Sequence, residues 1–400
     1  MSTAPQSLPS AQRKEIYYFI TYGICFISLG FGMSALGPML PYLADNVSVS
    51  IAQISFLFTA NSLGYLIGSA GGGRFYDRHK GHVLMLIALA LMIIMSTVLP
   101  LVAAFNGLLI VMFFFGLGMG LLDIGGNLNL LWVYQSRVGP FMNALHFCFG
   151  VGAFLSPIIL HSVRDLAGGA LTWPYWTLAL LFLPGIAGLI SLSSPKNPEA
   201  DVGENQAPNS NLRLVILMSV LLFLYVGIET GFGGMIFTYA TKGNIVSESS
   251  ASYINSIYWG ALTLGRLITI LLARKYSPAI ILAGNFSLSV LFLGLILIWP
   301  SNVVMIWVVS TGLGLALSSV FPTLLALGET RMKITGSITG WFFFGSSLGG
   351  TLLPMLLGQV FEYIGSYQMM ITLFVATFIG LLVLIGVILA SNKAGEKARI

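Results

Sequence analysis

The sequence predicts an all-α membrane protein in which twelve transmembrane helices form two pseudo-symmetric bundles of six. Three observations support this prediction: helix-length apolar runs, a polar stretch near the middle of the chain, and a weak internal repeat. The 400 residues are 56% hydrophobic and 8% charged, whereas soluble globular proteins carry roughly 25% charged residues. In lipid, only a helix or a closed barrel satisfies every backbone hydrogen bond. The apolar runs are continuous rather than alternating, so we expect helices.

Twelve apolar runs are long enough to cross a membrane. They are residues 16–43, 51–73, 82–104, 107–133, 140–163, 174–194, 212–241, 250–274, 279–299, 302–328, 335–363 and 367–391. Residues 195–211 interrupt them with a polar segment that is rich in Pro and Asn, which is typical of a flexible linker. We therefore expect an N-terminal bundle over 1–194, a linker over 195–211 and a C-terminal bundle over 212–400.

The loop charges predict the orientation in the membrane. Fifteen Lys and Arg residues fall on the side of the two termini and the linker, whereas Arg164 and Lys242 fall on the other side. Cytoplasmic loops carry the excess of basic residues, so we expect both termini and the linker to be cytoplasmic. The expected location is a bacterial inner (plasma) membrane. The net charge of +5 is spread over short loops, which predicts no nucleic-acid partner. Cys25 and Cys148 lie in apolar runs and are expected to be free thiols.

Glycines repeat between the two halves at an offset close to 197 residues. The matched pairs are Gly30 with Gly227, Gly37 with Gly234, Gly68 with Gly265 and Gly152 with Gly349, and at an offset of 196 Gly116 and Gly118 match Gly312 and Gly314. Parallel repeats of six helices are the plan of the major facilitator transporters, whose substrate sites lie near the bilayer midplane between the halves.

Two acids lie deep within apolar runs. Asp123 occupies the middle of GLGMGLLDIGGNLN, and Glu229 lies in the glycine-rich segment YVGIETGFGG, which we expect to be an irregular helix. A charge inside a membrane span is costly and points to a functional site. Each acid is a candidate ligand for a coupling ion, either sodium or a proton. The alternative for Glu229 is an ion pair with Arg266, a residue that we expect to have a gating or structural role.

Neutral polar and aromatic side chains within the spans are candidate substrate contacts. Asn143 and His146 are three residues apart and share a helix face. Further candidates are Asn61, Asn255, Tyr258, Trp259 and Trp341. Each of these is, taken alone, more often a packing or interface residue.

The loop sequence GRFYDRHKGH, residues 73–82, resembles the loop motif of the major facilitator family through Gly73, Asp77 and Arg78. The family uses this loop as a charge-paired latch on the cytoplasmic side, and the resemblance implies the same gating role here. A positive-inside anchor is the alternative.

Five segments narrow the resemblance to the fucose permease branch, and within it to sodium-dependent glucose transporter-like members. They are LLDIGGNLNLL (121–131), MNALHFCFGVGAFLSP (142–157), YVGIETGFGG (225–234), YWGALTLGR (258–266) and LSSVFPTLLALG (317–328). The resemblance implies a coupling role for Asp123 and substrate contacts for Asn127, Asn143 and His146. The chain departs from fucose permease at Gly37, which replaces an acid, and at His146 and Glu229, which each replace an amide.

These observations predict a secondary active transporter that imports a neutral monosaccharide, glucose-like or fucose-like, by symport with sodium or a proton. Asp123 and Glu229 would ligate sodium if sodium is the coupling ion. We expect a monomer in the lipid bilayer with no cofactor. An enzyme is disfavoured because the sequence carries no metal-ligand cluster, phosphate loop or nucleophile–base pair. Two alternatives remain: a proton-coupled exporter of amphipathic compounds, and a transporter-like nutrient receptor.

Overall fold

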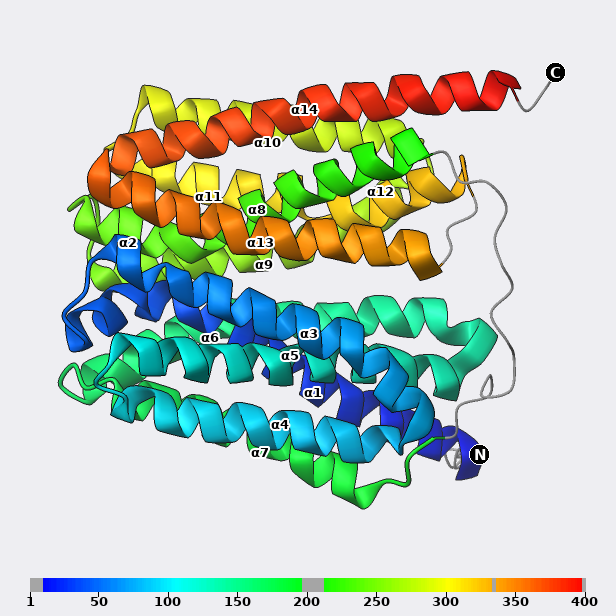
Figure 1. Ribbon diagram of the computed structural model, residues 1–400, viewed down its shortest axis with the longest axis horizontal. Coiled ribbons are helices and arrows are strands. Elements are labelled where there is room, and N and C mark those ends of the chain that lie inside the picture. The colour runs from blue at the N-terminus through cyan, green and yellow to red at the C-terminus, as the bar shows by residue number, and fades with distance from the viewer. Residues whose placement is uncertain (1–9, 196–211, 333–335, 398–400) are drawn as a thin grey trace, which may run out of the picture.

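The computed structural model describes residues 10–195, 212–332 and 336–397, which form helices that run side by side (Figure 1). The elements are α1 (Ser10–Asn46), α2 (Ile51–Ile54), α3 (Phe56–Arg78), α4 (Gly81–Val98), η1 (Leu99–Leu101), α5 (Phe105–Tyr134), η2 (Gln135–Arg137), α6 (Val138–Leu166), α7 (Thr172–Ser191), α8 (Leu212–Lys242), α9 (Glu248–Leu272), α10 (Pro278–Ile298), α11 (Val303–Leu317), α12 (Val320–Glu329), α13 (Gly336–Tyr363) and α14 (Ser366–Lys397). Within the described residues, twelve spans are long and apolar enough to cross a membrane, which confirms the predicted number.

Two of the twelve spans are broken. The second span starts with the single turn α2, where Ser50 forms a capping box with Gln53, and continues after Ser55 as α3. The tenth span divides into α11 and α12 at Ser318 and Ser319. The apolar runs in the sequence are continuous through both breaks and gave no indication of them.

The two halves of the molecule are α1–α7 and α8–α14, and Figure 1 shows them as separate groups of helices. The repeated glycines Gly152 and Gly349 make equivalent contacts in the two halves. A Cβ atom at Gly152 of α6 would overlap the backbone carbonyl of Ile27 in α1, and one at Gly349 of α13 would overlap that of Phe223 in α8. Small residues let helices in a membrane pack at close range. The helix contact between α1 and α6 is therefore repeated between α8 and α13.

The register of the repeat in the fourth and tenth spans differs from the prediction. Gly116 meets the backbone of Asn61 in α3, and its counterpart by contact is Gly314, which meets Tyr258 in α9. Contacts thus pair Gly116 with Gly314, at an offset of 198 residues rather than 196.

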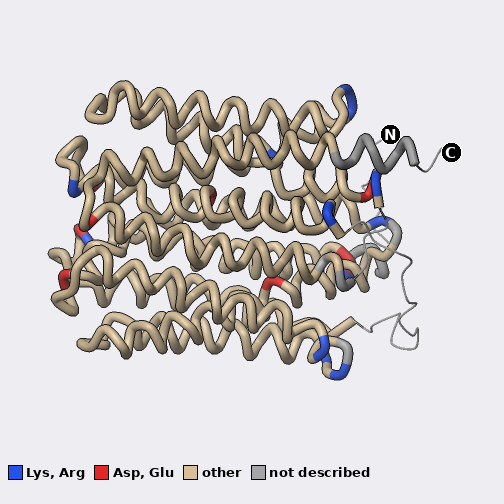
Figure 2. The backbone as a smooth tube through the Cα atoms, turned by 45° about the horizontal axis from the view of Figure 1, so that its top comes forward, with Lys and Arg blue, Asp and Glu red and all other residues tan. Residues whose placement is uncertain are grey.

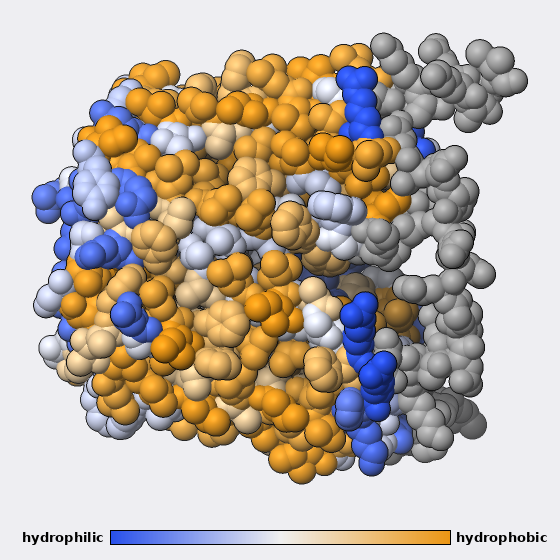
Figure 3. Space-filling model, viewed as in Figure 1, coloured by the Kyte–Doolittle hydropathy of each residue, from blue (hydrophilic) through white to orange (hydrophobic). Residues whose placement is uncertain are grey.

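The halves touch at one end of the molecule, which we call the closed end; α2 lies there, and α1 begins at the opposite, open end (Figure 1). Between the described residues of the two halves, hydrogen bonds join Ile51 to Glu362, Ala52 to Gln359, Ser55 to Met355, Thr59 to Thr351, Ser62 to Gly350 and Arg164 to Glu248. All of these lie toward the closed end, and the space-filling view is hollowed between the halves toward the open end (Figure 3). The conformation is open on the side where the first helix begins.

Charge and hydropathy follow the same axis. Figure 2 shows Lys and Arg gathered at the ends of the helices, with few charged residues between them. Figure 3 shows an apolar belt around the helices. The predicted linker, apart from Pro195, lies outside the described residues. Cys25 and Cys148 are free, as predicted.

Candidate substrate and ion site

Asp123 is held within the N-terminal half by two hydrogen-bond donors. The Tyr65 hydroxyl of α3 donates to Oδ2, and the Asn127 amide donates to Oδ1 over 3.0 Å. Asn127 is one turn further along α5, so the helix itself places the amide beside the acid. Among the ion pairs formed by described residues, none includes Asp123. This carboxylate is therefore stabilised by donors without a basic residue to neutralise it.

Glu229 lies in the C-terminal half and has a basic neighbour. Its Oε1 is 3.9 Å from Nη2 of Arg266, and the two side chains are 13% and 29% exposed. Arg266 also donates from Nε to the carbonyl of Ser318 over 3.2 Å, at the break between α11 and α12. The tyrosine hydroxyl of Tyr225 interacts with both members of the pair. The alternative considered from the sequence, an ion pair between Glu229 and Arg266, is the arrangement in the structure.

The backbone around Glu229 differs from the expectation. α8 is one uninterrupted helix from Leu212 to Lys242, so the predicted irregularity in YVGIETGFGG is wrong. Helical carbonyl groups are occupied in the ladder of backbone hydrogen bonds and are poor ligands for a cation. The break instead falls in the tenth span, beside Arg266. Close packing explains the glycines, because a Cβ atom at Gly234 would overlap the ring of Phe58.

His146 of α6 lies at the level of the Glu229–Arg266 pair. Its ring packs edge-on against Phe26 of α1 with centroids 5.6 Å apart. It also lies within electrostatic range of Arg266 in the opposite half. Asn143, one turn closer to the open end, is exposed. The predicted pair of His146 and Asn143 thus extends along α6 from the level of the Glu229–Arg266 pair toward the open end.

A small polar cavity lies between the halves on the closed-end side of these acids. It has a volume of about 30 Å³, which is room for about two water molecules. Asn61 and Ser62 of α3 line it from one half, and Thr230 and Trp259 line it from the other. The Oδ1 atom of Asn61 and the Nε1 atom of Trp259 are buried without a hydrogen-bond partner. Buried polar atoms are rarely unpaired, and both residues line the cavity, although the Asn61 oxygen lies next to Gly116 of α5.

Asn255 and Tyr258 are fully buried and use their donors on α8. The Asn255 amide donates to the carbonyl of Gly233 over 2.6 Å, and the Tyr258 hydroxyl donates to the carbonyl of Glu229 over 2.9 Å. In this conformation neither side chain is accessible to a solute. Both brace the helix that carries Glu229 rather than line the cavity.

The other predicted site residues lie apart from this region. Trp341 lines an apolar groove between α8 and α13, and no other predicted substrate residue lines that groove. Gly73 and Arg78 lie in the last turns of α3, at the open end. Asp77 is in the same helix, but its side chain lies outside the described part. Within the same loop His82 is bonded to the Tyr22 hydroxyl over 2.7 Å.

Sequence reasoning missed Tyr65 and Tyr225, which both contact a central acid. Tyr225 is four residues before Glu229, and this spacing on one helix face could have indicated it. Tyr65 is four residues after Asn61, so the two side chains share a face of α3, but its partner Asp123 is 58 residues away in the sequence. No local pattern could have indicated that contact.

Two repeated halves, a path open at one end and polar groups at their interface define a membrane transporter that works between the halves. The sequence profile of the Major Facilitator Superfamily matches residues 22–354, and the chain belongs to this family. It is not an enzyme.

The chain is similar to sodium-dependent glucose transporters and their relatives. It is 29% identical to sodium-dependent glucose transporter 1 of Danio rerio, over 91% of this chain and 68% of that protein. The human protein of the same name is 28% identical over 83% of this chain and 71% of its own length. Human major facilitator superfamily domain-containing protein 4A is 26% identical over 90% of this chain and 89% of its own.

Solved structures share the fold. A mutant of the nucleoside transporter NupG superimposes with a TM-score of 0.75 at 15% identity, covering 93% of this chain and 99% of the other. A bacterial homolog of the human lysosomal transporter Spinster, solved in an inward-facing and unoccupied conformation, gives a TM-score of 0.73 at 13% identity, covering 97% and 99%.

Proposed function

We propose that the protein is a cation-coupled symporter of a neutral monosaccharide, with Asp123 as the coupling residue. The observation that carries this proposal is the environment of the two central acids. Glu229 has Arg266 at 3.9 Å, whereas Asp123 has only the neutral donors of Tyr65 and Asn127 among the interactions of the described residues. A cation that enters the site gains most at the carboxylate whose charge is not already compensated.

The charge balance of the site supports a neutral substrate. Glu229 and Arg266 cancel each other, and one monovalent cation cancels the charge of Asp123. A loaded site is then neutral overall, so a substrate without charge adds no uncompensated charge in a region of low dielectric constant. The polar groups of Asn61 and Trp259 are suited to hydroxyl groups, and the indole supplies an apolar face. The cavity between them has room for about two water molecules in this conformation, so it has to widen when a sugar binds. The similarity to sodium-dependent glucose transporters at 28–29% identity supports glucose as the sugar and sodium as the cation.

The remaining predicted residues have distinct proposed roles. Asn127 orients the carboxylate of Asp123, and His146 and Asn143 lie along the substrate path toward the open end. Glu229 and Arg266 act as a pair that fixes α8 and α9 to the break between α11 and α12. In this proposal Asp123 rather than Glu229 is the main ligand of the coupling ion. Transport proceeds by rocking of the halves about the site, with both termini in the cytoplasm.

The test is uptake of labelled glucose into proteoliposomes, with a sodium gradient and a pH gradient imposed separately. The wild-type protein should accumulate sugar under one of the two gradients. Asp123→Asn removes the charge that binds the cation, so sugar should equilibrate but no longer accumulate. Concentrative uptake by Asp123→Asn equal to that of the wild type would refute the coupling role.

A matched control is Asp45→Asn, because Asp45 is an exposed acid at the closed end of α1. This variant should accumulate sugar like the wild type. Thermal melting of all three proteins in detergent shows whether they are folded. Fucose replaces glucose in a second series, since the geometry supports a hydroxyl-rich neutral ligand without naming one.

A further inference from the structure

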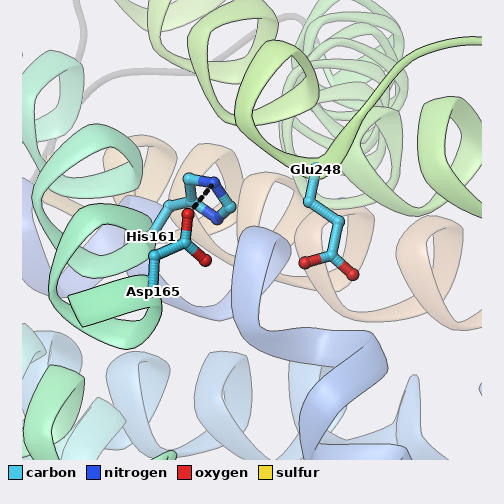
Figure 4. A group of neighbouring side chains, drawn as sticks. All are labelled: His161, Asp165 and Glu248. Carbon is cyan, nitrogen blue, oxygen red and sulfur yellow. Dashed lines mark ion pairs between the residues drawn. The ribbon is translucent and has the colours of Figure 1, made fainter. Parts of the chain in front are cut away.

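A cluster of metal-ligand side chains lies at the closed end, away from the site described above. His161 and Asp165 are one turn apart near the end of α6, and Glu248 is the first residue of α9 (Figure 4). One ligand atom from each residue lies within 4.8 Å of the others. The first two residues belong to the N-terminal half and the third belongs to the C-terminal half. The cluster therefore spans the junction between the halves.

His161 is buried but its polar atoms are not satisfied. Only 5% of the residue is exposed, and neither ring nitrogen makes a hydrogen bond. Its Nε2 atom lies 3.3 Å from Oδ2 of Asp165. Buried polar groups are nearly always hydrogen-bonded, so a buried imidazole whose only polar contact is this ion-pair distance to Asp165 points to a missing partner. A metal ion is a partner that imidazole and carboxylate groups can share.

The geometry suits a tetrahedral zinc ion. Two ligands about 2.0–2.1 Å from such an ion lie roughly 3.3 Å apart, and the His161 Nε2 and Asp165 Oδ2 atoms have this separation. Glu248 is 50% exposed at its side chain, so it can rotate toward the pair, and this rotation loosens its ion pair with Arg164. Imidazole favours zinc and related transition metals over calcium or magnesium, which prefer sets of oxygen ligands.

We propose that His161, Asp165 and Glu248 bind one Zn²⁺ ion that joins the two halves at the closed end. A water molecule completes the fourth position, as in zinc sites with three protein ligands. The two carboxylates balance the charge of the ion. Arg164 contacts Glu248 through Oε2 at 3.3 Å and stacks on the ring of Tyr42 at 3.5 Å, so the guanidinium competes for the carboxylate. The site is accordingly weaker than a closed structural zinc site with four protein ligands.

Zinc at this position should stabilise the conformation in which the closed end stays closed. In a rocking transporter the closed end must open during the cycle, which separates the C-terminal end of α6 from the N-terminal end of α9. The three ligands can then no longer share one ion. Zinc therefore inhibits transport without competing with sugar. This consequence rests on the proposed function, whereas zinc binding itself does not.

The first measurement is isothermal titration of the purified, tag-free full-length protein in detergent with zinc chloride. We expect one site per chain, and we expect His161→Gln, Asp165→Asn and Glu248→Gln each to weaken binding about tenfold or more, because even residues that merely orient a metal ligand cost that much. The matched controls are Asp45→Asn, an exposed acid at the same end, and His79→Gln, an exposed histidine at the other end. Both should bind zinc like the wild type.

No zinc binding by the wild type, or unchanged binding in all three ligand variants, would overturn the proposal. Asp165 and Glu248 are half exposed or more, so their variants remain informative if His161→Gln does not fold. The second measurement is glucose counterflow with and without zinc. Zinc should slow the wild type and leave Asp165→Asn unaffected. If the wild type binds zinc but no sample shows glucose counterflow, the result counts against the sugar substrate and not against the metal site.

Discussion

The two central acids show how single side chains share a membrane-embedded site. Glu229 and Arg266 are 3.9 Å apart and belong to different helices, α8 and α9. Removing one member leaves the other as an unpaired charge in a poorly solvated place. Breaking a fully buried pair costs about 3–5 kcal/mol, and we expect less here because Arg266 is 29% exposed.

At this scale we predict that Glu229→Gln and Arg266→Gln each lower the melting temperature of the purified protein, and that the double variant recovers part of the loss. Removing both charges leaves no unpaired charge, which is the physical reason for the recovery. A double-mutant cycle from denaturation in detergent measures the coupling. Additive losses in the double variant would show that the two residues do not act as a pair.

The Glu229–Arg266 pair could be suggested from the sequence because few charged residues lie within the spans, which leaves few possible partners. The donors around Asp123 were predictable in part. Asn127 follows from helix spacing, whereas Tyr65 is brought to the acid by packing of α3 against α5. Asn255 and Tyr258 were predicted as sugar ligands, but their partners are backbone carbonyls of α8. Sequence shows that a polar group is present, but only the fold shows whether its partner is protein or solute.

At the scale of the helix, glycine contacts set the distance between neighbouring elements. A Cβ atom at Gly152 would overlap the Ile27 carbonyl, and nothing lies within 4 Å of a Cβ atom at Gly71 in α3. We predict that Gly152→Ala destabilises the protein by about 1–3 kcal/mol through overpacking. Gly71→Ala should stabilise it by roughly 0.5–1 kcal/mol, because alanine loses less backbone entropy than glycine in a helix.

Thermal unfolding in detergent compares these variants, and Gly349→Ala provides the repeat-related test in the other half. Gly349 should behave like Gly152, since its Cβ atom would overlap the Phe223 carbonyl. Equal stabilities of Gly152→Ala and Gly71→Ala would contradict the role of close helix contacts.

The helices themselves were predictable, because length and hydropathy are properties of each run. All twelve predicted runs overlap spans found in the described residues, with ends that differ by a few residues. The breaks after α2 and between α11 and α12 were not predictable from apolar content, since both fall within apolar stretches. At the break in the tenth span, Arg266 donates a hydrogen bond to the carbonyl of Ser318, and the Asn285 amide donates one to the hydroxyl of Ser319. These partners come from other helices, so tertiary contacts rather than local composition explain how the break is accommodated.

For the whole molecule, the sequence predicts two halves but not which end is open. Composition and repeats are the same in every state of a rocking transporter, whereas contacts between the halves differ from state to state. Here the contacts gather at the closed end, where Ser55 packs against Gly358 and is fully buried, while Asn143 on α6 is exposed toward the open end.

This asymmetry predicts the accessibility of single cysteines. In a background with Cys25→Ala and Cys148→Ala, a membrane-impermeant maleimide should modify Asn143→Cys rapidly in inverted vesicles, where the cytoplasmic side faces outward. Ser55→Cys should be protected because the closed end excludes the reagent. Rapid modification of Asn143→Cys in right-side-out vesicles alone would reverse the orientation that the loop charges predict. Rapid modification of Ser55→Cys with protection of Asn143→Cys would mean that the opposite conformation dominates in the membrane. Added sugar together with the coupling cation should raise the modification rate of Ser55→Cys, because a loaded carrier also visits the state that opens the other end.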